Sequence, residues 1–330
     1  MKLNGAYSDK TKLFFKGECH MKTTETKVAA NTAVNNGNWS STTPVVPMHY
    51  MHIEIEWLEK ALGTSPNNQD ILAQYIASKA PDAPSKEQEI AAIGEQEVID
   101  QQTLVYPKGK FVKDKKTGRY IDILDTNVKL SAEEDDKGSV TYTIGADGEE
   151  NDGVYEDNVP YYYNYQIRGF FKDSCGLLNR AESVDENGKK TADGTESAKL
   201  KAYKKVIDGG IFVFPRRIAI EIPEFSLADD GFTMIPSYDE NGRLPVLSRP
   251  LRTSGPTGER TAIASSEVIP AGSRIRFTIG MTSLKFKPAV IEWLNYAVVH
   301  GISGWRNSGL GICRWREIQA DYTPFETTEG

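Results

Sequence analysis

A glycine-rich loop close to the C-terminus of this 330-residue chain constrains the fold more than any other segment. The loop reads Gly304-Trp-Arg-Asn-Ser-Gly309-Leu-Gly311. Residues 288–299 before it have apolar side chains at helical spacing, and residues 312–318 after it alternate as in a strand. The predicted order is therefore helix, glycine loop, strand, whereas the two common phosphate-binding loops connect a strand to a helix. This order excludes both of those motifs here, and an ordinary tight connection stays an equal alternative.

The composition of the loop fits a close approach of the backbone to a ligand. Glycine places no Cβ between a main-chain N–H and a bound phosphate or sugar. Arg306 and Asn307 lie between the glycines and can reach phosphate groups or base edges. Trp305 either stacks on a base or fills the core, and the core is the more frequent role of such a residue. The loop is therefore a candidate binding site.

Charge is unevenly distributed along the chain. Residues 1–160 hold 17 Lys and Arg against 26 Asp and Glu, whereas residues 161–330 hold 22 against 20. The net charge of −7 argues against a nucleic-acid partner, but a local basic face can bind phosphates whatever the total. The arginines that gather late in the chain are Arg216, Arg217, Arg249, Arg252, Arg260, Arg274, Arg276, Arg306, Arg314 and Arg316.

Other features of the composition exclude several classes of protein. No apolar run approaches the roughly 18 residues of a membrane span, and the N-terminus lacks the apolar core of a signal peptide. We therefore expect a cytoplasmic protein without a membrane partner. The three cysteines are far apart and the four histidines form no cluster with them. The sequence thus predicts free thiols and neither a metal nor a cofactor.

The pattern along the chain predicts an α+β fold in four regions. Residues 1–47 are a polar segment without periodicity, which predicts a disordered tail. Residues 48–81 hold the first part of the core, with a strand at 50–58. Residues 82–160 are an insertion in which short strands alternate with acidic, glycine-rich turns that favour hairpins. Residues 161–330 hold the rest of the core.

Within the last region, several segments have clear periodicity. Residues 210–222 give the strongest strand signal, and residues 267–279 alternate in the same way. Residues 167–178 have a helical apolar face, with a predicted start near Gly169. Residues 249–260 carry three arginines amid Pro, Gly and Ser, as in an extended basic hairpin, although an ordinary solvated loop is an equal alternative.

Four segments, taken in order, resemble the RAMP superfamily, the ferredoxin-like RNA-binding proteins of CRISPR effector complexes. The first is the opening strand with its continuation Leu62-Gly-Thr-Ser-Pro66. The second, Ile167-Arg-Gly-Phe-Phe-Lys172, is similar to the helix start Pro-Gly-Ser-Ser-Leu-Lys-Gly of that superfamily, although Arg-Gly-Phe-Phe replaces its core. The third, 268–277, resembles its Val-Pro-x-Gly-Thr-x-Phe strand, and the fourth is the closing helix with its glycine loop.

The resemblance implies a ferredoxin-like (RRM-like) core and binding of single-stranded guide RNA without reading its sequence. It is strongest to the crRNA-binding backbone subunits, so the implied partners are RNA, copies of the chain itself and other effector subunits. A helix that starts near Gly169 would offer free N–H groups to a phosphate, with Lys172 in its first turn. The predicted RNA-binding residues are Arg168, Gly169, Lys172, Arg249, Arg252, Arg260, Gly304, Arg306, Asn307, Gly309 and Gly311.

Alternatives stay open at this point. Tyr161–Tyr165 can form a stacking platform for bases, although tyrosines packed in a strand edge are the more frequent case. Some RAMP proteins cleave RNA, and His300 or Asp70 are the candidate catalytic groups, but a separate supporting signal is absent and we predict no catalytic residue. A third class is a viral or mobile-element assembly or decoy protein with the same fold and no nucleic acid.

Overall fold

In the computed structural model, the first predicted strand lies in the middle of a sheet. This strand, β1 (His49–Trp57), turns Ile53, Ile55 and Trp57 into the core and Glu54 to the opposite face, as its alternation predicts. The structure describes residues 48–66, 103–125, 130–134, 140–144, 151–180, 194–228, 230–255, 258–304 and 306–319.

Four antiparallel strands form the central part of this sheet. β1 pairs with β17 (Cys313–Glu317) on one side and with β16 (Arg274–Met281) on the other. β16 also pairs with β10 (Ile211–Phe214), so the order of these strands is β17-β1-β16-β10. The strand predicted over 210–222 is confirmed in two pieces, β10 and β11 (Arg217–Glu221). The segment 267–279 likewise divides between two strands at a turn.

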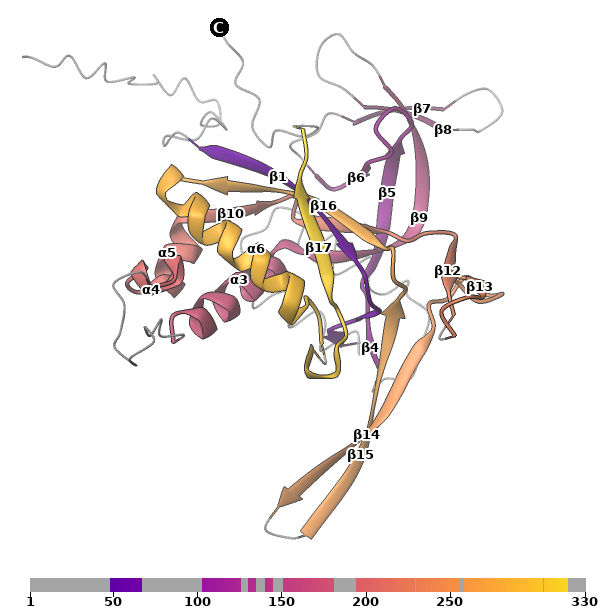
Figure 1. Cartoon of the computed structure of the whole chain (residues 1–330). Coiled ribbons are helices and arrows are strands. Elements are labelled where there is room, and N and C mark those ends of the chain that lie inside the picture. Colours follow the sequence, from indigo (N-terminus) through magenta and orange to yellow (C-terminus); the bar gives the residue numbers. More distant parts are fainter. Residues whose placement is uncertain are drawn as a thin grey trace, which may run out of the picture. The chain divides into compact units, whose positions relative to one another are not determined.

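Two long helices cover one face of the sheet. These are α3 (Asn164–Leu178) and α6 (Lys287–His300), with α5 (Tyr203–Gly210) and the short α4 (Glu196–Lys199) beside α3 (Figure 1). The helix predicted over 288–299 is confirmed. Its buried face, however, includes Trp293, whose ring packs 5.4 Å from that of Phe171 in α3. Burial of such apolar side chains is the main stabilising contribution to the fold.

The strands predicted between 82 and 160 continue the same sheet. β9 (Asn151–Tyr163) pairs with β11, and β5 (Lys108–Asp114) pairs with β9. The other strands of this region that belong to the same sheet are β6 (Tyr120–Asp122), β7 (Leu130–Glu134) and β8 (Val140–Ile144). One of the glycine-containing turns predicted in this region is confirmed at Thr117–Gly118, between β5 and β6, where Gly118 has a φ of 66°. β9 runs through residue 160 without a break, pairing with β11 on the core side and with β5 in the insertion, so one sheet continues from the core into the insertion.

A second sheet is built on a long hairpin that extends away from the first sheet (Figure 1). The hairpin consists of β14 (Val246–Gly255) and β15 (Gly258–Ile269), which confirms the predicted extended hairpin. The short strands that join it are β2 (Ala61–Leu62), β3 (Ser65–Pro66) and β4 (Thr103–Val105), of which β4 runs parallel to β15. A separate small hairpin consists of β12 (Phe225–Leu227) and β13 (Met234–Pro236), and the 3-10 turns are η1 (Leu284–Phe286) and η2 (Arg306–Ser308).

The mixed α+β class predicted from the sequence is confirmed, with mostly antiparallel sheets. No helix among the described residues is long and apolar enough to cross a membrane. Several subjects of the sequence predictions lie outside the described residues: the tail 1–47, residues 67–102, which include Asp70, and Trp305. The side chains of Arg252, Arg260 and Asn307 also lie outside them.

Candidate functional site

Two of the four glycines between residues 301 and 311 hold the loop in its conformation. Gly301 and Gly311 have φ values of 78° and 79°, which favour glycine. The N–H of Ile302 donates to the carbonyl of Gly311 over 2.8 Å, and the N–H of Gly311 donates to the carbonyl of Lys60 over 2.8 Å. A Cβ on Gly311 would lie 2.5 Å from the carbonyl oxygen of Ile302. The role of Gly311 is therefore to close the loop.

The other two glycines leave open space beside the backbone. A Cβ on Gly309 would meet no atom within 4 Å among the residues described. A Cβ on Gly304 would touch Leu62 and Thr64 only at 3.9 Å, which is ordinary van der Waals contact. Gly304 therefore lies beside the turn that follows the first strand, and its main chain is open to a ligand on that side.

One face of α3 connects the same turn to the loop. Gln166 donates from Nε2 to Oγ1 of Thr64 over 2.7 Å, and Asp173 pairs with Arg306 over 2.8 Å. Gly169 lies between Gln166 and Asp173 on this face, since their spacing is i, i+3, i+7. A Cβ on Gly169 would meet no described atom within 4 Å. We call the surface formed by Thr64, Gly169, Asp173, Arg249, Gly304 and Arg306 the glycine-loop junction.

The base of the long hairpin also reaches this junction. Arg249 of β14 donates from Nη1 to the Oγ of Ser308 in the loop over 2.8 Å. On β15, the hydroxyl of Ser266 donates to the carbonyl of Gly63 over 2.8 Å, and Gly63 donates from its N–H to the carbonyl of Glu267. These bonds attach the hairpin to the turn after the first strand. Arg249 of β14 therefore contacts the same loop that carries Arg306.

The ion pair of the junction is accessible to solvent. The side chains of Arg306 and Asp173 are 29% and 44% exposed, and exposed pairs of this kind contribute little to stability. An incoming anion can therefore replace Asp173 as the partner of Arg306. His300, whose ring stacks on Tyr296 at 4.7 Å, is close enough to respond to this pair. Burial and the charge of Arg306 lower the pKa of His300, while Asp173 opposes that shift.

The predicted start of α3 is wrong, and with it the role of Lys172. The helix begins at Asn164, where Gln166 accepts from the N–H of Tyr163 as in a capping box. Gly169 is consequently in the middle of the helix and offers no free N–H group. Lys172 lies in the third turn, where it pairs with Asp208 of α5. Arg168, one turn earlier, is on the same flank as Lys172, away from the flank that meets the loop.

The tyrosine segment does not form a stacking platform. Tyr161, Tyr162 and Tyr163 are 1–3% exposed, and their rings pack in the interior. Tyr162 stacks on Trp57 at 5.7 Å, and Tyr161 meets Tyr163 edge to face at 5.1 Å. This confirms the packing alternative, although β9 is an interior strand rather than an edge. Tyr162 packs in the main core, and Tyr161 and Tyr163 pack in a second cluster, so both faces of this strand are covered.

Most of the late arginines already have carboxylate partners. Arg217 is buried against Asp122, and its guanidinium also lies over the rings of Phe111 and Tyr161 at 5.5 and 5.3 Å. Five more form ion pairs with Asp or Glu: Arg274, Arg276, Arg306, Arg314 and Arg316. Sequence reasoning missed these pairs because their members lie far apart along the chain. Within the described ranges, no group of three or more His, Cys, Asp or Glu is placed to hold a metal ion.

Comparison with known proteins finds no matching family model and no matching curated protein. Among solved structures, a chain of a "Type IV-B CRISPR Complex" is 12% identical, with a TM-score of 0.33, over 83% of this chain and 92% of that chain. A chain of a "Type III-B Cmr-beta bound to cognate target RNA" is 9% identical, with a TM-score of 0.32, over 82% of this chain and 60% of that chain. Both TM-scores are too low to assign a family.

Proposed function

We propose that this chain binds single-stranded RNA through the phosphate backbone at the glycine-loop junction, as a subunit of a CRISPR-type ribonucleoprotein. The observation that carries the proposal is that the four RAMP-like segments contact one another there. Leu62 pairs with Val268 of the third segment, Thr64 bonds to α3 of the second, and Arg306 of the fourth pairs with Asp173. Segments far apart in sequence thus meet where ligand contact was predicted.

The connectivity of the core supports the same proposal. The chain order β1, α3, β10, β16, α6, β17 is the βαββαβ order of a ferredoxin-like fold. The spatial order β17-β1-β16-β10, numbered along the chain, is 4-1-3-2. Both connecting helices lie on one face of the sheet (Figure 1). We therefore assign a ferredoxin-like core to these six elements, with residues 82–160 as its insertion.

The chemistry of the junction fits a phosphate and not a particular base. Arg306 and Arg249 supply guanidinium donors, which bind phosphate oxygens in pairs. The open backbone at Gly304 and Gly309 lets a sugar–phosphate chain approach within hydrogen-bonding distance of the main chain. Such contacts fix the position of a nucleic acid but carry no sequence information. We expect similar affinities for unrelated RNA sequences.

A pair of opposite substitutions tests this proposal. Asp173→Asn releases Arg306 from its ion pair, so the affinity for a fluorescent single-stranded RNA should rise about threefold. Arg306→Ala removes the cation and should lower the affinity about tenfold. The matched control is Lys204→Ala on the exposed side of α5. Equal affinities of both variants and the wild type for two unrelated RNA sequences would contradict the proposal.

The state of the purified protein tests the assembly. An RNA-bound chain of copies should have a high ratio of absorbance at 260 to 280 nm and a large mass, and ribonuclease should remove both. A protein-like ratio that stays low after RNA is added would instead support the assembly or decoy alternative, in which the same fold has no nucleic acid. The copy number and the other subunits would follow from the measured mass.

One observation favours a second function, RNA cleavage. The lowered pKa of His300 keeps its imidazole neutral near neutral pH, and its neighbour Arg306 could stabilise developing charge. Loss of cleavage in His300→Ala, with RNA binding retained, would establish an endoribonuclease. Binding without any cleavage by the wild-type chain would reject it. Asp70, the other candidate, lies outside the described residues.

A further inference from the structure

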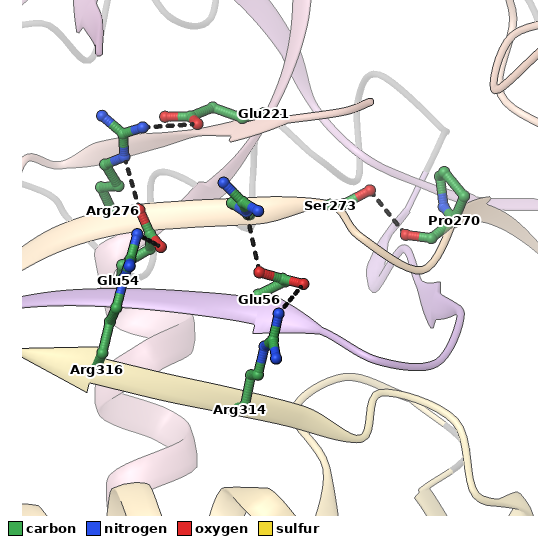
Figure 2. A network of polar contacts seen from close by, with 9 residues as sticks. Glu54, Glu56, Glu221, Pro270, Ser273, Arg276, Arg314 and Arg316 are labelled. Atoms are coloured by element: carbon green, nitrogen blue, oxygen red, sulfur yellow. Dashed lines mark hydrogen bonds and ion pairs between the residues drawn. The ribbon is translucent and has the colours of Figure 1, made fainter. Parts of the chain in front are cut away.

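A ladder of alternating acidic and basic side chains covers the sheet face turned away from α3 and α6 (Figure 2). Its acidic members on β1 are Glu54 and Glu56, which alternate with core residues. In the strand register, Glu54 lies opposite Arg276 of β16 and opposite Arg316 of β17. Glu56 lies opposite Arg274 and Arg314 in the same way. We call Glu54, Glu56, Glu221, Arg274, Arg276, Arg314 and Arg316 the arginine ladder.

Each carboxylate on β1 is held from both neighbouring strands. Glu54 accepts from Arg276 at 3.2 Å and from Arg316 at 2.6 Å. Glu56 accepts from Arg274 at 3.1 Å and from Arg314 at 2.8 Å. Two carboxylates thereby fix four guanidinium groups. Arg276 also pairs with Glu221 of β11 over 3.3 Å. The other three guanidinium groups keep N–H donors that a ligand can use. Figure 2 shows Arg314 and Arg316 on the β17 side of β1 and Arg276 on the β16 side.

The ladder is layered, with its positive charge outermost. The side chains of Glu54 and Glu56 are 6% and 16% exposed, whereas those of Arg314 and Arg316 are 64% and 67% exposed. An anion that approaches this face meets guanidinium groups first and is screened from the carboxylates beneath them. Four arginines against three glutamates also leave the ladder with an excess of one positive charge, before any neighbouring lysine is counted.

The ladder lines a hollow of the size that a small ligand needs. The hollow has a volume of about 320 Å³ and is lined by Glu54, Glu56, Arg274, Arg314, Trp315 and Arg316. Ligand sites commonly begin at about 300 Å³. The turn between β5 and β6 adjoins the ladder, since Arg276 donates to the carbonyl of Thr117 over 3.1 Å. That turn follows Lys113, whose positive charge favours the ionised form of Glu221.

We propose that this hollow binds a compact phosphorylated small molecule of the nucleoside di- or triphosphate class. Arg314 and Arg316 lie two residues apart on β17, and Arg274 faces them across β1, so each guanidinium can take an oxygen of a different phosphate. Glu56 at the base of the hollow offers an acceptor for hydroxyl groups of a sugar. The site differs from the glycine-loop junction, because its residues lie on the other face of the sheet, and it does not rest on the proposed function.

Phosphate groups also occur in nucleic-acid strands, so the experiment separates the two sources. The full-length chain is titrated, at low salt and without divalent cations, with ATP, with inorganic tripolyphosphate and with a single-stranded RNA. We expect ATP and tripolyphosphate to bind to the wild type, and Arg314→Glu with Arg316→Glu to weaken both about tenfold or more. The control double variant Lys204→Glu with Lys205→Glu should bind as the wild type does, since both residues are exposed on α5.

Two further variants keep the test independent of folding and of the proposed function. Arg314→Lys with Arg316→Lys retains the charge and should lose part of the affinity, while its thermal unfolding should match the wild type. Arg249→Ala with Arg306→Ala should leave ATP binding unchanged even if RNA binding is lost. Absence of ATP and tripolyphosphate binding by the wild type would overturn the proposal. So would unchanged binding in the glutamate variant, or a loss in that variant confined to RNA.

Discussion

The glycine-loop junction and the arginine ladder hold arginines in two different settings. At the junction, Arg306 has one exposed aspartate partner and Arg249 bonds to a serine hydroxyl. In the ladder, four arginines from two strands hold two glutamates that are nearly buried. The arginines of the ladder therefore keep fixed positions, whereas the arginine of the junction can exchange its partner. The burial of the carboxylate partner, and not the number of arginines, therefore decides which arginines a flexible polyanion can bind.

The largest expected effect is on stability, and it should follow the burial of the arginine whose carboxylate is removed, which falls from Arg217 to Arg276 to Arg306. Asp122→Ala removes the carboxylate that pairs with the buried Arg217 and should cost about 3–5 kcal/mol. Glu54→Ala, in the ladder, should cost about 1–2 kcal/mol. Asp173→Ala, at the junction, should cost at most about 0.5 kcal/mol. Urea unfolding gives the free energy of unfolding of the three variants, and equal losses would contradict the predicted order.

The second prediction separates the glycines that close the loop from those that leave it open. Gly311→Ala strains a positive φ and forces a contact with Ile302, so it should lower the free energy of unfolding by about 2 kcal/mol. RNA affinity should fall with it. Gly304→Ala places its methyl group in ordinary contact and should leave stability within about 0.5 kcal/mol. Thermal unfolding and RNA binding are measured together, and a stable Gly311→Ala variant would contradict the assigned role.

The third prediction concerns the salt dependence of RNA binding. Each phosphate contact to a single strand contributes about 0.7 to the slope of log K against log salt. Arg249→Ala with Arg306→Ala should therefore lower that slope by about 1.4, which a fluorescence anisotropy titration at several salt concentrations can resolve. Arg314→Ala with Arg316→Ala is the matched pair from the ladder and should leave the slope unchanged. The reverse pattern would place the RNA on the ladder.

The smallest expected effect is a pH dependence of RNA affinity. Burial and Arg306 hold the pKa of His300 below its usual 6.5, so the free chain carries a neutral imidazole at neutral pH. A phosphate bound to Arg306 offsets that charge and raises the pKa of His300, so the complex binds more protons than the free chain. Affinity should therefore rise about two- to threefold as the pH falls from neutral through this range. His300→Asn should abolish the rise, and NMR titration of the imidazole checks its cause.

Local periodicity predicted much of the fold. The strands at β1, β10 and β16 and the helix α6 follow from alternation or helical spacing within a short segment. The hairpin was predicted from its composition, three arginines amid Pro, Gly and Ser. The start of α3 was missed because Tyr163 and Gln166 form its cap, and tyrosine is not a typical capping residue. The extension of the core sheet by β9 was missed because strand pairing joins residues about fifty positions apart in sequence.

The candidate site was predicted in part for the same reason. Glycine spacing identified the loop. The predicted hairpin included Arg249, which contacts the loop through Ser308. The separation of Lys172 from Arg306 on opposite flanks of one helix depends on where that helix begins, which a short apolar pattern does not fix. The ladder depends on the pairing of β1 with strands more than 200 residues away, so its carboxylates gave no local signal.

Photo-crosslinking of a single-stranded RNA that contains 4-thiouridine, followed by mass spectrometry of the bound peptides, tests the central claim most directly. We expect crosslinks to the glycine loop at 301–311, to the turn at 62–66 and to the face of α3 that carries Gly169. We also expect the same peptides for two unrelated RNA sequences. Crosslinks confined to β17 and the ladder face, or a pattern that changes with RNA sequence, would contradict this claim.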